Sequence, residues 1–179
     1  NKLTRNSLLG HSAYRWQQLE KMDKSIIETY PNAWDFGNSD KQMKSTAGNF
    51  RIEYVDLLEI AMGAPLGGQA YLVTNDKKRL IDNWCSGPPI WNTEGKKVAI
   101  PKWTRTFWKG TLQKLIVIDL LTGEMTTFKR KFHLLDLRSF DKTVIFGYDS
   151  PKHKPKTVEF DIEKEKIEIK NKITVANKV

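Results

Sequence analysis

A single cysteine, Cys85, is the strongest nucleophile that this sequence offers. A thiolate needs a neighbouring base or a positive field to become reactive. Cys85, His133 and Asp136 therefore define one hypothesis, an enzyme whose site is assembled from dispersed residues. No cysteine-hydrolase signature surrounds Cys85, and a lone cysteine beside a tryptophan, here Trp84, is typical of a small buried apolar residue. We therefore assign no catalytic residue and expect a protein that is not an enzyme.

The histidines and glycines show no spacing that binds a metal ion or a phosphate. His11, His133 and His153 lie far apart, and none belongs to a helical pair such as HExxH. The glycine-rich segment 63–68 lacks the Lys-Ser/Thr that completes a phosphate-binding loop, so we interpret it as a turn. We expect neither a metal site nor a cofactor.

Aromatic and basic side chains alternate over residues 103–109, and this is the pattern most suggestive of binding. Such side chains stack on nucleic-acid bases or anchor a protein interface. The structural alternative is that Trp103 and Trp108 complete the core at the edge of a sheet. A basic loop at 152–156 adds further cations. The predicted binding residues are Trp103, Arg105, Phe107, Trp108, Lys109, Lys152 and Lys154.

The net charge is strongly positive, because 30 Lys and Arg stand against 21 Asp and Glu, giving +9 at pH 7. This charge attracts an acidic protein surface, a nucleic acid or an anionic lipid. Much of the excess lies in short runs such as 129–131 and 152–156, which are usually solvated loops or strand edges.

The compartment stays open between cytoplasm and periplasm. One cysteine excludes an intramolecular disulfide and mildly favours a reducing compartment. No run approaches the roughly 18 apolar residues of a membrane span, so we expect none. The N-terminus shows no charged-then-apolar leader, but the chain begins at Asn1 rather than Met, so a removed leader or tag remains an alternative.

The sequence predicts a short helical part followed by a longer β-rich part, and these elements must position the candidate site residues. Apolar residues recur every three or four positions over 12–30, which predicts an amphipathic helix with one buried stripe. The polar stretch 35–49 predicts a long, mobile loop. From residue 51 onward, β-branched and aromatic residues predict strands over 51–60, 69–74 and 78–81, although 57–62 could also form a helical turn.

A hairpin pattern at 89–124 returns, degenerate but recognisable, at 135–166. Aligning residues 98–100 with 144–146, and 118–120 with 160–162, gives each unit a turn, a strand, a loop, a strand ending in Asp and a second turn. Asp119 and Asp161 fall at equivalent positions, where we expect each carboxylate to accept hydrogen bonds at a strand-to-turn junction. Units of about 40 to 46 residues built from antiparallel strands have the size of propeller blades.

Residues 89–166 resemble the blades of TolB-like bacterial propeller proteins, chiefly in the phrases IWNTEGKKVAI at 90–100 and QKLIVIDLLTGE at 113–124. The resemblance implies antiparallel blade-like sheets. A closed propeller needs at least four blades and this chain supplies fewer than three, so a complete propeller is not expected. We predict instead an α+β fold, a β-dominated antiparallel meander packed against the N-terminal helix. The prediction is one domain over 1–179, with a helix and loop at 1–50 and a β-rich body at 51–179.

These features favour a non-enzymatic protein-binding domain whose partner has an acidic surface. In length, lack of motifs and asymmetric charge, the chain resembles small bacterial immunity proteins, which occlude a toxin. The first alternative is a nucleic-acid-binding module that uses basic loops and exposed tryptophans. The second is the dispersed Cys85 and His133 enzyme site described above.

Overall fold

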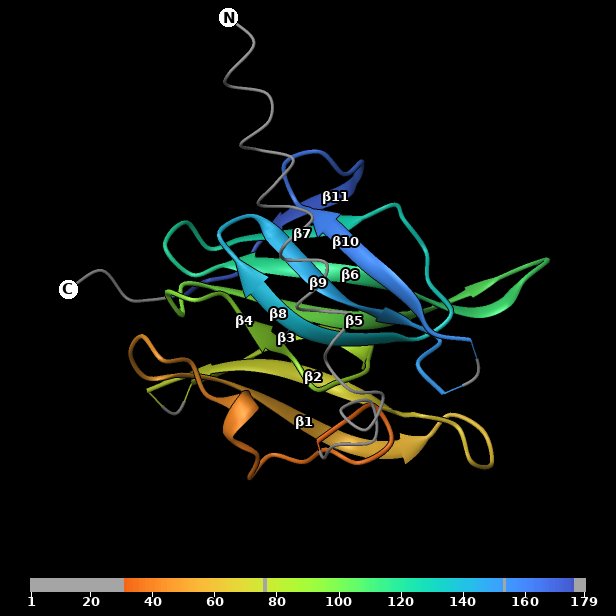
Figure 1. The fold of residues 1–179 in the computed structure, drawn as a ribbon. Helices are drawn as coiled ribbons and strands as arrows, with labels where there is room; N and C mark the ends of the chain where they lie inside the picture. Colours follow the sequence, from red (N-terminus) through yellow and green to blue (C-terminus); the bar gives the residue numbers. More distant parts are fainter. Residues whose placement is uncertain (1–30, 76, 153, 176–179) are drawn as a thin grey trace, which may run out of the picture.

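The computed structural model describes residues 31–75, 77–152 and 154–175, which form two antiparallel sheets (Figure 1). Strands account for 59% of the structure and helix for 2%. In the described ranges the helical element is a three-residue 3-10 turn, η2 (Lys41–Met43). The predicted α+β class is therefore wrong, and the fold is β-dominated. The amphipathic helix predicted over 12–30 lies outside the described residues.

Most strands follow one another along the chain as hairpins, so the predicted antiparallel, β-rich character is confirmed. They are β1 (Phe50–Glu59), β2 (Leu66–Thr74), β3 (Lys77–Cys85), β4 (Ile90–Trp91), β5 (Lys97–Thr106), β6 (Gly110–Asp119), β7 (Glu124–Phe128), β8 (Leu135–Asp141), β9 (Val144–Asp149), β10 (Lys156–Asp161) and β11 (Ile167–Lys172).

The larger sheet has eight strands in the order β1-β2-β3-β5-β6-β7-β11, with β4 also paired to β5. The smaller sheet has three strands in the order β10-β9-β8. In Figure 1, β1 and β2 lie at one end of the large sheet and β11 at the other, while the small sheet covers β5, β6 and β7.

The central strands β5 and β6 are apolar on both faces, because each face meets its own core. On β6, Ile116 and Ile118 join a first core cluster, whereas Leu115 and Val117 join a second one. The second cluster fills the space between the two sheets. Within it the rings of Phe128 and Phe160 meet edge to face with centroids 5.0 Å apart.

The opposite face of the large sheet is covered in part by segments outside the strands. Phe36 and Met43, from the stretch that precedes β1, are buried in the first cluster, and so are Ile173 and Val175 after β11. The predicted loop at 35–49 does lack strands. However, its two buried apolar side chains attach it to the core, which is not how a freely mobile loop behaves.

The two predicted repeat units lie in different sheets and face each other. Strands β4, β5 and β6 come from the first unit and lie in the large sheet, whereas β8, β9 and β10 come from the second and form the small sheet. The pairing register differs by one residue from the sequence alignment: Val98 pairs with Ile118, and Ile145, not Val144, pairs with Phe160. Because side chains alternate between faces, this single step decides which residues are buried.

Asp119 and Asp161 stand at strand-to-turn junctions, as expected. The Asp119 Oδ1 accepts hydrogen bonds from the backbone N–H groups of Leu121 and Thr122 at 2.9 and 3.1 Å. The Asp161 Oδ1 accepts one from the N–H of Glu163 at 3.1 Å. The described strands form two packed sheets and no ring of blades; the TolB-like resemblance itself stays a prediction.

Candidate binding surface at the β5–β6 hairpin

The turn between β5 and β6 presents two aromatic side chains to solvent. Thr106 pairs with Gly110, so residues 107–109 form the turn, and Gly110 closes it with a φ of 67° that glycine adopts without strain. The Thr106 hydroxyl donates to the Gly110 carbonyl at 2.9 Å. Phe107 and Trp108 are 90% and 89% exposed. Their rings meet edge to face with centroids 4.8 Å apart.

This hairpin projects beyond the body of the protein, at the right of Figure 1. At its base, the Arg105 guanidinium lies 5.5 Å from the ring centroid of Trp84 on β3, a cation–π contact. The Trp84 ring in turn lies 6.4 Å from that of Trp103. The exposed tip therefore extends from a base where Arg105, Trp84 and Trp103 pack together.

A hollow of about 480 Å³ lies between the tip and the chain that connects β7 to β8. We call it the tip groove. It is lined by Arg105, Thr106, Phe107, Trp108, Lys109, Leu112, Lys131, Phe132 and His133.

Backbone hydrogen bonds hold the connecting chain in place beside β6. Gln113 and Phe132 exchange two of them, at 2.7 and 2.8 Å. The carboxylate of Asp149 accepts two more, from the N–H groups of His133 at 2.9 Å and Leu134 at 3.0 Å. The wall of the tip groove opposite the hairpin is thus fixed by β6 on one side and by β9 on the other.

The charged side chains that line the tip groove are all basic. Arg105, Lys109 and Lys131 are exposed, and among the residues that the structure describes no acidic side chain belongs to the lining. None of these three cations forms an ion pair with another described residue. Their charge is consequently not compensated within the described part of the chain, and an anionic partner would meet a favourable potential there.

The structure separates the predicted binding residues into three places. Phe107, Trp108, Lys109 and Arg105 all line the tip groove. Trp103 does not, because it is only 3% exposed and belongs to a third core cluster with Ala33 and Leu134. Trp103 is therefore a core residue, as the structural alternative predicts. Trp108 is exposed, so that alternative is wrong for it.

Lys152 and Lys154 lie in the β9–β10 connection rather than in the tip groove. The Lys152 Nζ stands 4.0 Å from the ring centroid of Trp34, and the Trp34 indole N–H donates to the Gly63 carbonyl at 3.1 Å. Lys154 is exposed. In Figure 1 this connection, the β1–β2 turn and the β5–β6 tip lie at the same end of the protein.

Sequence reasoning missed the second wall of the tip groove, formed by Lys131, Phe132 and His133 together with Leu112. The sequence places Lys131 in a run of cations that is typical of a solvated loop, and no local pattern relates residue 132 to residue 113. The pairing between them is an isolated bridge outside the named strands. Sequence reasoning also missed the end of β1 and the β1–β2 turn as a surface, where Leu58 on β1 is largely exposed and Met62 in the turn is fully exposed.

Cys85 has the surroundings of a core residue. It is fully buried in the first cluster, and burial raises the pKa of its thiol, with smaller effects from Asp82 and Lys102. A protonated thiol is a poor nucleophile.

The other members of the proposed trio are engaged elsewhere. The Asp136 carboxylate is paired with Arg138. His133 is exposed at the tip groove. The structure therefore gives the Cys85 hypothesis no support. In the described ranges, no three His, Cys, Asp or Glu side chains cluster as metal ligands would. His11 and His153 lie outside the described residues.

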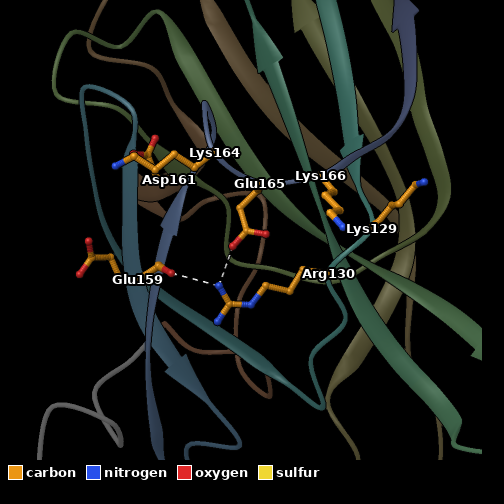
Figure 2. A pocket seen from close by; sticks show the side chains of 7 residues that line it. All are labelled: Lys129, Arg130, Glu159, Asp161, Lys164, Glu165 and Lys166. Atoms are coloured by element: carbon orange, nitrogen blue, oxygen red, sulfur yellow. Dashed lines mark hydrogen bonds and ion pairs between the residues drawn. The ribbon is translucent and has the colours of Figure 1, made fainter.

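A larger hollow, of about 610 Å³, lies where the β7–β8 connection meets the β10–β11 turn (Figure 2). The Arg130 guanidinium fills its centre and donates to the Glu165 carboxylate at 2.7 Å and to the Glu159 carbonyl at 3.1 Å. It also lies over the Phe132 ring, 5.0 Å from the centroid. These contacts connect the two sheets at their rim, so we assign this hollow a structural role.

Comparisons with known proteins give no family and no relative for this chain. No protein-family model matches it, and neither a curated protein nor a solved structure shows significant similarity to it. Among the residues that the structure describes, no helix has the length and apolar character that crossing a membrane requires.

Proposed function

We propose that this protein binds another protein through the β5–β6 hairpin tip and the groove beside it. The observation that carries the proposal is the exposure of Phe107 and Trp108 on a projecting hairpin. Two adjacent aromatic side chains at about nine-tenths exposure are unusual for a protein surface, and exposed apolar patches rimmed by polar residues mark interaction sites. Tryptophan and arginine are also enriched among the residues that dominate binding energy.

Burial of this tip by a partner supplies a substantial driving force. Fully burying a phenylalanine side chain contributes about 1.5–3 kcal/mol, and a tryptophan carries more apolar area still. The hairpin is already folded, because Thr106 and Gly110 close its turn, so little ordering entropy opposes association. A preformed aromatic tip is therefore an efficient anchor.

The charge of the tip groove favours a partner with an acidic surface. Arg105, Lys109 and Lys131 are uncompensated within the described part of the chain, and the whole sequence carries a charge of +9. Complementary charges raise the association rate and disfavour basic partners. More specifically, we propose that the protein is of the immunity type and occludes a toxin. The partner should then lose its activity when bound.

A nucleic acid is the second candidate, because the same uncompensated cations suit phosphates. Retention on heparin or single-stranded DNA at low salt, lost steeply as salt rises, would favour it. Absence of retention at low salt would remove it.

The proposal is tested by comparing what the wild-type chain and a Phe107→Ala/Trp108→Ala variant capture from a lysate of the source cell. Leu121→Ala is the matched control, because Leu121 is an exposed apolar residue on a different turn. We expect at least one protein to be captured by the wild type and the control but not by the tip variant. Identical capture by all three chains would show the proposal to be wrong.

A further inference from the structure

The tip groove combines an apolar lining with a basic rim, and this combination restricts the kinds of ligand that it can bind. Phe107 and Trp108 lie on one side, and the largely buried Leu112 and Phe132 contribute apolar surface to the lining. The cations Arg105, Lys109 and Lys131 line the same hollow. An occupant must therefore offer an apolar group and negative charge within a short distance of each other.

Several basic residues of the described chain are matched by acids, whereas Arg105, Lys109 and Lys131 have no ion pair with another described residue. Lys102 pairs with Asp82, Lys114 with Glu168, and Arg130 with Glu165. Further pairs join Lys78 to Glu53, Lys170 to Glu124 and Arg138 to Asp136. What distinguishes the tip groove is that three such unmatched cations line one hollow together with exposed aromatic side chains.

The shape of the site favours a peptide over a nucleic acid. Single strands bind along a track, on aromatic faces that stack successive bases. Here the Phe107 and Trp108 rings stand at 82° to each other, so they do not form parallel platforms. The hollow is also compact, with a volume of about 480 Å³, which suits an apolar side chain and its neighbours.

We infer that the tip groove binds an acidic segment of the partner protein, in which carboxylates flank an apolar side chain. The apolar side chain packs between the hairpin tip and the chain around Phe132, and the carboxylates meet Arg105, Lys109 and Lys131. The inference rests on the proposed protein-binding function and adds to it the chemistry of the bound segment.

The test uses three fluorescein-labelled probes: the peptide acetyl-Asp-Asp-Leu-Phe-Glu-Glu-amide, its counterpart with four lysines in place of the acids, and a ten-nucleotide oligo-dT strand. Fluorescence anisotropy at low and moderate salt measures their dissociation constants with the intact chain. We expect the acidic peptide to bind most tightly. Lys131→Glu is expected to weaken it by about tenfold or more, a difference of about 1.4 kcal/mol.

Lys41→Glu is the charge-matched control, because Lys41 is an exposed cation on η2 outside the tip groove. Its dissociation constant is expected to stay within about twofold of the wild type, since a distant surface charge is screened. Equal binding of the acidic and basic peptides, or equal effects of Lys131→Glu and Lys41→Glu, would overturn the inference. Tighter binding of oligo-dT than of the acidic peptide would overturn it in favour of a nucleic acid.

The inference and the proposed function fail in different ways. If partner capture depends on Phe107 and Trp108 but is unchanged by Lys131→Glu, the tip binds a protein and the acidic-segment inference is wrong. If capture does not depend on the tip at all, the proposed function fails first.

Discussion

Asp119 in the large sheet and Asp161 in the small sheet stabilise the turns that follow them with the same pattern of hydrogen bonds. Each ends a strand, and each accepts a hydrogen bond from the backbone N–H two residues further along the chain. Each also uses its own carbonyl to accept from a later N–H of the turn, that of Gly123 or Glu165. The similar geometry of these two turns is the clearest structural sign of the repeat.

These contacts predict matched losses of stability. Asp119→Ala and Asp161→Ala should each lower the free energy of unfolding by about 1 kcal/mol, because the first removes the acceptor of two turn N–H groups and the second that of one. Asp→Asn at either position keeps an oxygen acceptor and should recover much of the loss. Urea unfolding at pH 7 measures the effect; equal stability of the Ala and wild-type chains would contradict it.

The contribution of Asp161 should also depend on pH. Its hydrogen bond with Lys164 lowers the pKa of the Asp161 carboxyl in the folded state, helped by the N–H of Glu163. A lowered pKa means that the stabilising effect is present above the ordinary aspartate value of about 3.9 and is lost as pH falls through the folded value. The difference between Asp161→Ala and the wild type should therefore shrink in acid. A difference that grows as pH falls would have the wrong sign.

Cys85 and Tyr54 predict a loss of stability in alkali. Burial raises the pKa of both groups in the folded protein, and the Tyr54 hydroxyl donates to the Ser86 carbonyl at 2.9 Å. A raised pKa stabilises the folded state fully below the unfolded value, which is about 8.5 for a thiol and about 10 for a phenol, and the benefit falls as pH rises above it.

Unfolding titrations from pH 7 to 10.5 check this prediction. Stability should decline above about pH 8.5, and Cys85→Ala should remove the earlier part of the decline. In the folded state at pH 8, Cys85 should also resist a thiol reagent until the protein unfolds. Rapid labelling of the folded protein would show that the thiol is accessible.

Gly147 on β9 is required by close packing against β8. A Cβ atom at this position would stand 2.3 Å from the carbonyl oxygen of Asp136, a distance that backbone atoms cannot accommodate without moving. Gly147→Ala should therefore lower the free energy of unfolding by about 2 kcal/mol or more. The matched control is Gly37→Ala, because a Cβ there meets nothing within 4 Å. Thermal or urea unfolding should separate the two; similar effects would contradict the packing of β8 on β9.

The sequence predicted the elements with local signals and missed those set by tertiary contacts. The hairpin pattern at 89–124 predicted paired strands there, and Asp119 and Asp161 were placed correctly because turn chemistry is local. The repeat register was wrong by one residue, since Val98 and Ile145 occupy equivalent places only through their partners on neighbouring strands. An α+β class was predicted from a helical period at 12–30, which lies outside the described residues.

The candidate site was half visible in the sequence. Phe107, Trp108 and Lys109 are consecutive in the chain. A hairpin turn at this point is therefore enough to expose all three together. Trp103 belongs to the same run but points into the third core cluster, because its strand passes Ile60 and Trp84 there. The second wall, at Lys131 and Phe132, depends on a long-range bridge that no local pattern encodes.

The most direct measurement is the dissociation constant between the captured partner and the full chain, determined by isothermal titration calorimetry for the wild type and for Phe107→Ala/Trp108→Ala. Because the partner would bury both aromatic side chains, we expect the variant to bind it about 100-fold or more weakly. The circular dichroism spectrum should be unchanged, because neither side chain belongs to the core. An unchanged dissociation constant in a folded tip variant would contradict the claim that this hairpin is the binding surface.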